Sequence, residues 1–110
     1  MTPWTKQHDI DLVVAYLGYE IQTCGKLTVC IDGDGKTNWI PDMRDRTHGW
    51  LLDCLDSWLR VRKQYRHALL ESNYASLIDC DIAMNRRPGE GDNMHQALAW
   101  ALWRARIDAQ

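Results

Sequence analysis

The chain has 110 residues, of which 45% are hydrophobic and 25% are charged, the proportions of one globular domain, residues 1–110, with a single core. Its formal net charge of −2 excludes a global attraction to nucleic acid or to anionic membranes, so any such contact requires a local patch. No apolar run approaches the ~20 residues of a membrane span, and the start, "MTPWTKQHDIDL", lacks the pattern of a signal peptide, so we expect a cytoplasmic protein with no membrane contact.

The first element in chain order is a predicted helix. Thr2-Pro3 is typical of an N-cap followed by proline at the first helical position. Gly18 is the expected C-cap. Between them, apolar residues repeat at helical spacing, at Ile10, Val13, Val14 and Leu17.

A β-hairpin is predicted next. Leu27, Val29 and Ile31 alternate with Thr28 and Cys30, and this alternation is typical of a strand. The segment "DGDG", residues 32–35, supplies an Asp-Gly turn, and a second strand is expected before Pro41.

The second helix is predicted between Asp45 and Lys63, because its apolar residues sweep an arc of roughly 200° around the helix axis. Its end is ambiguous. The apolar phase continues to about Glu71, which favours a longer helix, whereas a turn near Gln64 followed by a short strand, "RHALL", also fits. We favour the continuous helix and expect segment 65–71 to be helical.

The last third of the chain predicts a strand, a loop and a helix. One face of the strand collects Tyr74, Ile78, Cys80 and Ile82. The segment "NRRPGEGD", residues 85–92, is expected to be a loop, and Asn93 with Gln96 forms a capping-box arrangement at the start of the helix. The elements predict an α+β fold in the order α-β-β-α-β-α, with a small antiparallel sheet of three to four strands packed against three helices.

Four segments of the chain match a known pattern. They are the first helix ending at "YLGYE", "WIPDM" leading into "THGWLLDCLDSW", the strand "YASLIDCDI" and the closing "NMHQALAWALWRA". In this order, over roughly residues 6–107, the chain resembles the phage ABA-sandwich family of small phage proteins. It departs from the family at "DMRDRT", and the family's second hairpin is not obvious if the long helix continues. The resemblance implies a sheet between helices and a phage accessory protein, and it assigns no active site.

No catalytic or metal-binding motif is evident. The segment "DGDGK", residues 32–36, lacks the oxygen ligands that an EF-hand-like loop needs at its fifth and twelfth positions, which favours a hairpin turn. Two pairs of aspartates share a face, Asp53 with Asp56 and Asp79 with Asp81, without a recognisable catalytic partner. The histidines lie in separate elements, and only His48 is expected near a cleft. We therefore expect no enzymatic activity, no metal and no cofactor.

The four cysteines, Cys24, Cys30, Cys54 and Cys80, are widely spaced and contain no C-x-x-C pair. In a cytoplasmic protein this spacing favours reduced, mostly buried thiols over disulfides.

Two basic segments suggest anionic ligands. In "RVRKQYRH", residues 60–67, basic side chains surround Tyr65, as on single-strand nucleic-acid surfaces, although cations also stabilise the C-terminus of a helix without any ligand. Arg86 and Arg87 precede a glycine-containing loop that leads to a helix N-terminus, where backbone N–H groups favour phosphate. A nucleotide- or phosphate-binding module using Arg86 and Arg87 is the alternative function.

The last helix carries two of the six tryptophans of a chain without phenylalanine. Trp100, Trp103 and Ile107 lie roughly opposite the face of Leu98 and Leu102. Either the helix is sandwiched, or this face, flanked by Arg104, meets a partner.

We favour a partner-binding face made of Trp100, Trp103, Arg104 and Ile107. The partner would be a host protein, a protein–nucleic-acid complex or a second copy held through the last helix. By analogy, the expected function is that of a small phage-type accessory protein that blocks a host component, such as a bacterial defence complex of the CRISPR type.

Overall fold

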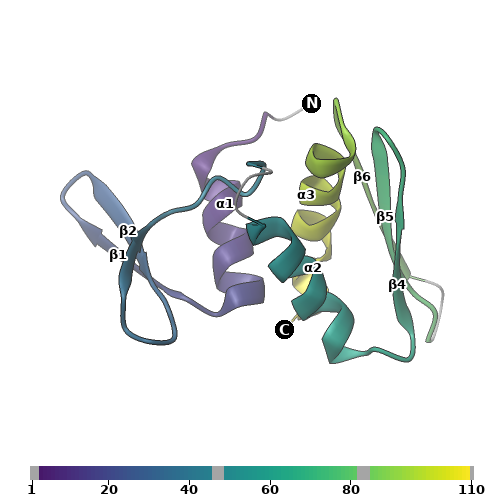
Figure 1. Cartoon of the computed structure of the whole chain (residues 1–110), viewed down its shortest axis with the longest axis horizontal. Coiled ribbons are helices and arrows are strands. Elements are labelled where there is room, and N and C mark those ends of the chain that lie inside the picture. The colour runs from purple at the N-terminus through teal and green to yellow at the C-terminus, as the bar shows by residue number, and fades with distance from the viewer. Residues whose placement is uncertain (1–2, 46–48, 82–84, 110) are drawn as a thin grey trace.

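The structure is a computed structural model that describes residues 3–45, 49–81 and 85–109. Within these ranges, three α-helices accompany two three-stranded antiparallel sheets (Figure 1), which confirms the α+β class. The elements in chain order are α1 (Lys6–Leu12), η1 (Val13–Leu17), β1 (Glu20–Cys24), β2 (Leu27–Ile31), β3 (Thr37–Trp39), α2 (Trp50–Val61), β4 (Arg66–Leu70), β5 (Tyr74–Asp79), β6 (Asn85–Glu90), α3 (Met94–Ala105) and η2 (Arg106–Ala109). The predicted order is therefore roughly right, but the strands form two separate sheets. None of the described helices is long and apolar enough to cross a bilayer.

The first helix begins later than predicted. Thr5, in an extended conformation, precedes α1, whereas Pro3 lies outside the helix and Thr2 lies outside the described residues. The backbone N–H of Thr5 donates to Nδ1 of His8 (3.0 Å), so the His8 side chain caps this start. Helix α1 continues into η1, a π-helical turn, and ends as predicted at Gly18, whose φ of 69° suits glycine.

The predicted hairpin is the β2–β3 half of the first sheet, which has the order β1-β2-β3. The Asp32 carboxylate accepts the backbone N–H groups of Asp34 (3.0 Å) and Lys36 (2.9 Å) and closes the Asp-Gly turn. These backbone N–H groups, above all that of Lys36, hold the pKa of Asp32 below its usual value. The sheet lies beside α1 at one end of the molecule (Figure 1).

The continuous helix predicted for residues 65–71 is wrong. Helix α2 ends at Val61, and the N–H groups of Tyr65 (2.9 Å) and Arg66 (3.0 Å) donate to the carbonyl of Arg62 to close a turn. The following strand, β4, pairs with β5 from Arg66↔Asp79 to Leu70↔Ala75. Pairing with a neighbouring strand overrides the helical phase, because the same leucines also suit a strand.

The predicted loop at residues 85–92 is also wrong, because β6 occupies Asn85–Glu90 and pairs with β5. Proline and glycine suggested a loop, yet the structure gives a reason for each of them within β6. Pro88 lies in an edge strand, where a missing N–H is tolerated. Gly89 allows α3 to approach, since a Cβ there would lie 2.1 Å from the carbonyl oxygen of Ala97.

Helix α3 packs against β5 and β6 and carries much of the core. The Asn93 side chain accepts the N–H of Gln96 (3.0 Å), which confirms the predicted cap. Leu98 and Leu102 of the predicted core face are buried, whereas Met94 at the first turn is 45% exposed. Tyr16 of η1 donates its hydroxyl to the carbonyl of Leu102 (2.6 Å), so the first and last helical segments enclose one core.

Candidate functional site

Helix α3 presents its tryptophans to the first turn of α1. The His8 ring lies with its centroid 5.0 Å from that of Trp100 and 4.8 Å from that of Trp103. Trp4 stacks on His8 at 4.9 Å and meets Trp100 edge-on at 5.0 Å. We refer to Trp4, His8, Trp100 and Trp103 as the tryptophan cluster. It joins residues from both ends of the chain.

Two carboxylates of α1 fix the indoles of this cluster. The Nε1–H of Trp103 donates to Asp11 (3.0 Å), and that of Trp4 donates to Asp9 (2.9 Å). Asp9 also accepts the backbone N–H of Met43 (3.0 Å). Burial raises the pKa of Asp9 above its usual value, although both of these hydrogen bonds oppose the rise. These two hydrogen bonds therefore fix the orientation of the Trp103 and Trp4 indoles.

Three guanidinium groups border the cluster and form what we name the arginine rim: Arg44, Arg104 and Arg106. Arg106 lies 3.9 Å from the ring centroid of Trp103, Arg104 lies 5.7 Å from that of Trp100, and Arg44 lies 5.6 Å from that of Trp4. These are cation–π distances. Tryptophan and arginine are the residue types most enriched among binding hot spots, so this combination is typical of a contact surface.

Two surface pockets adjoin the cluster. One, of about 310 Å³, is lined by Pro88, Glu90, Trp100 and Arg104. The other, of about 230 Å³, has Trp4, Lys6, Asp42 and Arg44 among its lining residues. Each pocket combines an indole with charges of both signs. The arrangement suits an apolar side chain of a partner together with polar groups of either charge, and it shows no preference for an isolated anion.

The structure brings together most of the predicted partner-binding residues. Trp100 and Trp103 are half-buried, because α1 covers part of their face, and Arg104 is exposed beside them. Ile107 follows in η2 and is 61% exposed. Helix α3 is thus covered by the second sheet on one side and partly by α1 on the other, a mixture of the two alternatives that the sequence leaves open.

Sequence reasoning missed Trp4 and His8. Trp4 precedes the helix and follows no apolar period, so nothing in the pattern placed it on α3. One signal was present: Trp4, His8 and the aspartates at 9 and 11 place two rings and two carboxylates within eight residues, just before and within the amino-terminal helix.

The alternative anion site is not assembled. Consecutive residues of a strand point to opposite faces, and β6 pairs Arg86 with Ile78 and Arg87 with Leu77. The two guanidinium groups therefore lie on opposite sides of the second sheet. They do not converge on one phosphate.

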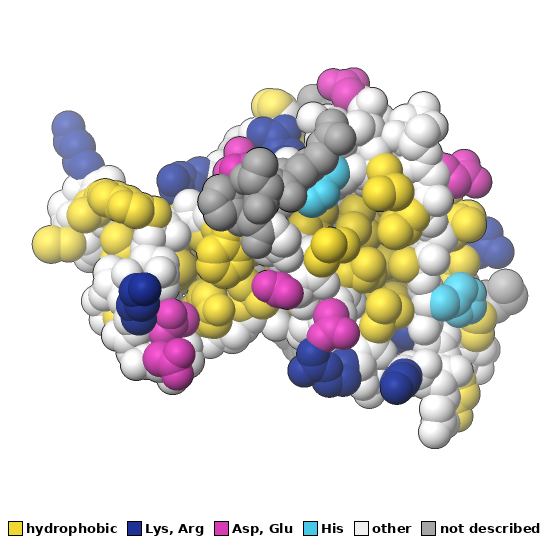
Figure 2. Space-filling view, in the orientation of Figure 1, with side chains coloured by type: hydrophobic (Ala, Val, Ile, Leu, Met, Phe, Trp, Pro, Cys, Tyr) yellow, Lys and Arg dark blue, Asp and Glu magenta, His cyan; other side chains and the backbone are white. Residues whose placement is uncertain are grey.

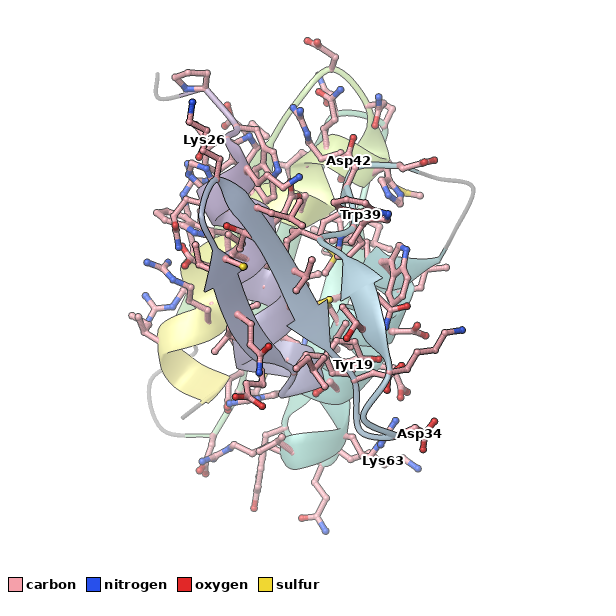
Figure 3. The ribbon with its side chains drawn as sticks, turned by 90° about the vertical axis from the view of Figure 1, so that its left-hand side faces the viewer. Tyr19, Lys26, Asp34, Trp39, Asp42 and Lys63 are labelled. Carbon is pink, nitrogen blue, oxygen red and sulfur yellow. The ribbon has the colours of Figure 1, made fainter. Side chains whose placement is uncertain are left out.

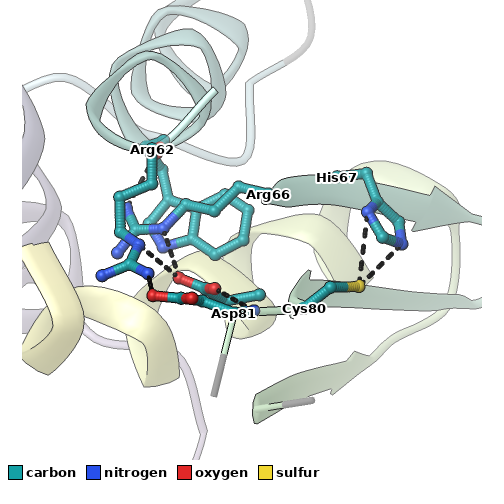
Figure 4. A network of polar contacts seen from close by, with 7 residues as sticks. Arg62, Arg66, His67, Cys80 and Asp81 are labelled. Atoms are coloured by element: carbon teal, nitrogen blue, oxygen red, sulfur yellow. Dashed lines mark hydrogen bonds and ion pairs between the residues drawn. The ribbon is translucent and has the colours of Figure 1, made fainter. Parts of the chain in front are cut away.

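The basic segment at residues 60–67 is largely neutralised within the protein (Figure 4). Arg62 contacts Asp79 (3.1 Å) and Asp81, and Arg66 also contacts Asp79 (3.2 Å). Arg60 pairs with Asp56 one turn earlier on α2. Three of the four aspartates singled out in the sequence, Asp56, Asp79 and Asp81, therefore face arginines, and these ion pairs leave little free charge for nucleic acid.

The remaining predicted features are accounted for individually. In the part of the chain that the structure describes, no three histidine, cysteine or acidic side chains are grouped as metal ligands. His48 lies outside that part.

The four cysteines differ in exposure. Cys30 and Cys54 are buried, and burial raises the pKa of Cys54 to about 12. Cys24 and Cys80 are exposed, contrary to the expectation of mostly buried thiols, and Cys80 lies 3.9 Å from Nε2 of His67.

Comparison of the chain with protein-family profiles, with curated proteins and with solved structures finds no match. The interpretation of the site therefore depends on its geometry.

Proposed function

We propose that this protein acts by binding a partner protein through the tryptophan cluster and the arginine rim, and that it blocks the partner by occupying its surface. The observation that supports this function best is the packing of three partly exposed indoles against the buried ring of His8, with a guanidinium group at the ring of each indole. Aromatic and arginine side chains that are held in place before binding lose little conformational entropy on association.

The charges around the cluster favour a protein as the partner. A nucleic-acid surface needs an excess of positive charge, whereas here Asp42 and Glu90 line the same pockets as Arg44 and Arg104. Interfaces between proteins commonly have an aromatic centre and a polar rim of both signs. The resemblance to small phage proteins makes a bacterial defence complex of the CRISPR type the first partner to test.

The test is an interference assay in a bacterium that carries such a defence complex. Expression of the protein should restore plaque formation by a targeted phage, and the Trp100→Ala/Arg104→Glu variant should abolish the effect. Trp39→Ala is the matched control, because Trp39 is 69% exposed and lies on β3, outside the cluster. Full activity of the double variant at equal protein level would contradict the proposed surface. No effect of the unmodified protein would reject this partner.

A further inference from the structure

Strand β1 forms an open edge of the first sheet. Among the described residues it pairs only with β2, on one side. Its residues are exposed apart from Ile21, which is partly buried. A free edge presents unpaired backbone N–H and C=O groups, which are a template for pairing with another strand.

This edge has neither a bulge nor a proline to prevent pairing. The β1–β2 register runs without a bulge from Glu20↔Ile31 to Cys24↔Leu27, and β1 contains no proline. By contrast, the opposite edge strand of the same sheet, β3, has three residues, and β6 carries Pro88. Short edges and prolines discourage edge-to-edge pairing.

The sheet also exposes apolar side chains. Val29 pairs with Trp39, so Leu27, Val29 and Trp39 share one face of the sheet. Leu27 is 46% exposed and Trp39 is 69% exposed. Figure 2 shows apolar side chains at the left-hand end of the molecule, and Figure 3 views this sheet face-on. A wider sheet would cover part of this surface with the side chains of an added strand.

We propose that β1 pairs antiparallel with β1 of a second copy, joining two three-stranded sheets into one six-stranded sheet. The charges select the register. With Thr23 on the two-fold axis, Glu20 at the start of β1 lies beside the β1–β2 turn of the second copy, which carries Lys26, and Lys26 lies beside the second copy's Glu20. Centring the pair on Gln22 would place Glu20 opposite Cys24, and centring it on Cys24 would place Lys26 opposite Gln22.

Glu20 and Lys26 are available for these contacts. Neither has an ion-pair partner in the described part of the chain, and Lys26 lies at the tip of the β1–β2 turn (Figure 3). Opposite charges facing each other across strands stabilise the pairing, and like charges destabilise it. The occupant that fits this edge is therefore another copy of this chain.

The proposed dimer does not use the predicted contact through the last helix. In Figure 1, β1 and β2 lie on one side of α1 and α3 lies on the other. Pairing of the β1 edges leaves the tryptophan cluster accessible, so failure of the dimer and failure of the proposed function are separate results.

Sedimentation velocity over a range of protein concentrations tests the pairing. The unmodified chain should dimerise, and Glu20→Lys should raise the dissociation constant at least tenfold, because two like-charge pairs then face each other. Lys26→Glu should do the same, and the Glu20→Lys/Lys26→Glu variant should restore dimerisation. Glu71→Lys, an exposed residue outside β1, is the control and should have no effect. A chain that stays monomeric at millimolar concentration, or a double reversal that fails to restore the dimer, would overturn the proposal.

Disulfide trapping tests the register. In a Cys24→Ser background, Thr23→Cys should give a disulfide-linked dimer on mild oxidation, because directly opposite residues lie within disulfide reach. The unmodified chain should link through Cys24 much more slowly, since Cys24 faces Gln22 of the second copy. Faster linkage through Cys24 than through Thr23→Cys would contradict this register.

Discussion

Trp103 connects the last helix to the first. Its Nε1–H donates to Asp11, its ring packs on His8, and its other side is covered by the guanidinium group of Arg106. A single side chain thus serves both the fold and the candidate contact surface. A substitution of Trp103 can change both the stability of the fold and the contact surface. A conservative substitution separates these two effects best.

We predict that Trp103→Phe lowers the free energy of unfolding by about 1 kcal/mol, because an aromatic ring is kept at this half-buried position and one hydrogen bond to a partly exposed carboxylate is lost. Asp11→Ala should cost a similar amount, and the double variant should cost less than the sum. Urea unfolding of the four proteins in this cycle measures the coupling. Strict additivity would mean that the indole–carboxylate contact contributes nothing.

Asp9 is expected to give stability an unusual pH dependence. Its pKa is raised by burial, so the folded state binds a proton more tightly than the unfolded state does. The stabilisation that Asp9 contributes is therefore fully present at pH values below 3.8, the pKa of this group in the unfolded chain. It is lost as the pH rises through the raised pKa of the folded protein. Asp9→Asn keeps an oxygen acceptor for Trp4 and Met43 without the charge.

We subtract the unfolding free energy of the unmodified protein from that of Asp9→Asn. This difference should become more positive as the pH rises above 3.8, because only the unmodified protein loses the stabilisation from Asp9 there. Denaturant titrations at a series of pH values measure it. A difference that is constant with pH would show that burial does not perturb this carboxyl group.

At the scale of the elements, the contact of α3 with β6 depends on Gly89. A Cβ there would lie 2.1 Å from the carbonyl oxygen of Ala97 and 2.3 Å from the backbone nitrogen of Ala101, and backbone atoms cannot move aside cheaply. We predict that Gly89→Ala costs about 3 kcal/mol or more. Gly33→Ala is the matched control, since no atom lies within 4 Å of its Cβ, and it should be nearly neutral. Equal melting temperatures for the two variants would mean that α3 and β6 are not in close contact.

The sequence predicted those elements whose signals are local. The cap at Asn93, the C-cap at Gly18 and the Asp32 turn each depend on a few neighbouring residues, and all three are found. Strand β6 was missed and β4 was only the second choice, because the identity of both depends on pairing with β5. In β4 the helical phase of Ala68 and Leu69 with the preceding helix outweighed a strand pattern that does not alternate. In β6, Pro88 is tolerated at the edge of the sheet and Gly89 allows α3 to approach closely. Both residue types are also typical of loops.

At the scale of the whole molecule, the candidate site depends on contacts between the two ends of the chain. The sequence indicated Trp100, Trp103 and Arg104, because helical phase alone separates them from the core face. It gave no means of placing Trp4, His8 or Arg44, since these lie far from α3 in sequence and follow no shared period. The closing of α1 onto α3 is what converts two tryptophans on a helix into a rigid cluster with an arginine rim.

The central claim, that this protein binds a partner through the tryptophan cluster, is tested most directly by site-specific photo-crosslinking in the cells that express it. A photoreactive phenylalanine derivative replaces Ile107, which follows Trp103 in η2 and is 61% exposed, or Leu52 of α2, which is 58% exposed and serves as the matched control. We predict a discrete adduct with one protein from position 107 and none from position 52, and loss of that adduct when Trp100→Ala and Arg104→Glu are added. Adducts of equal yield from both positions, or an adduct from position 107 that survives those two substitutions, would contradict the account.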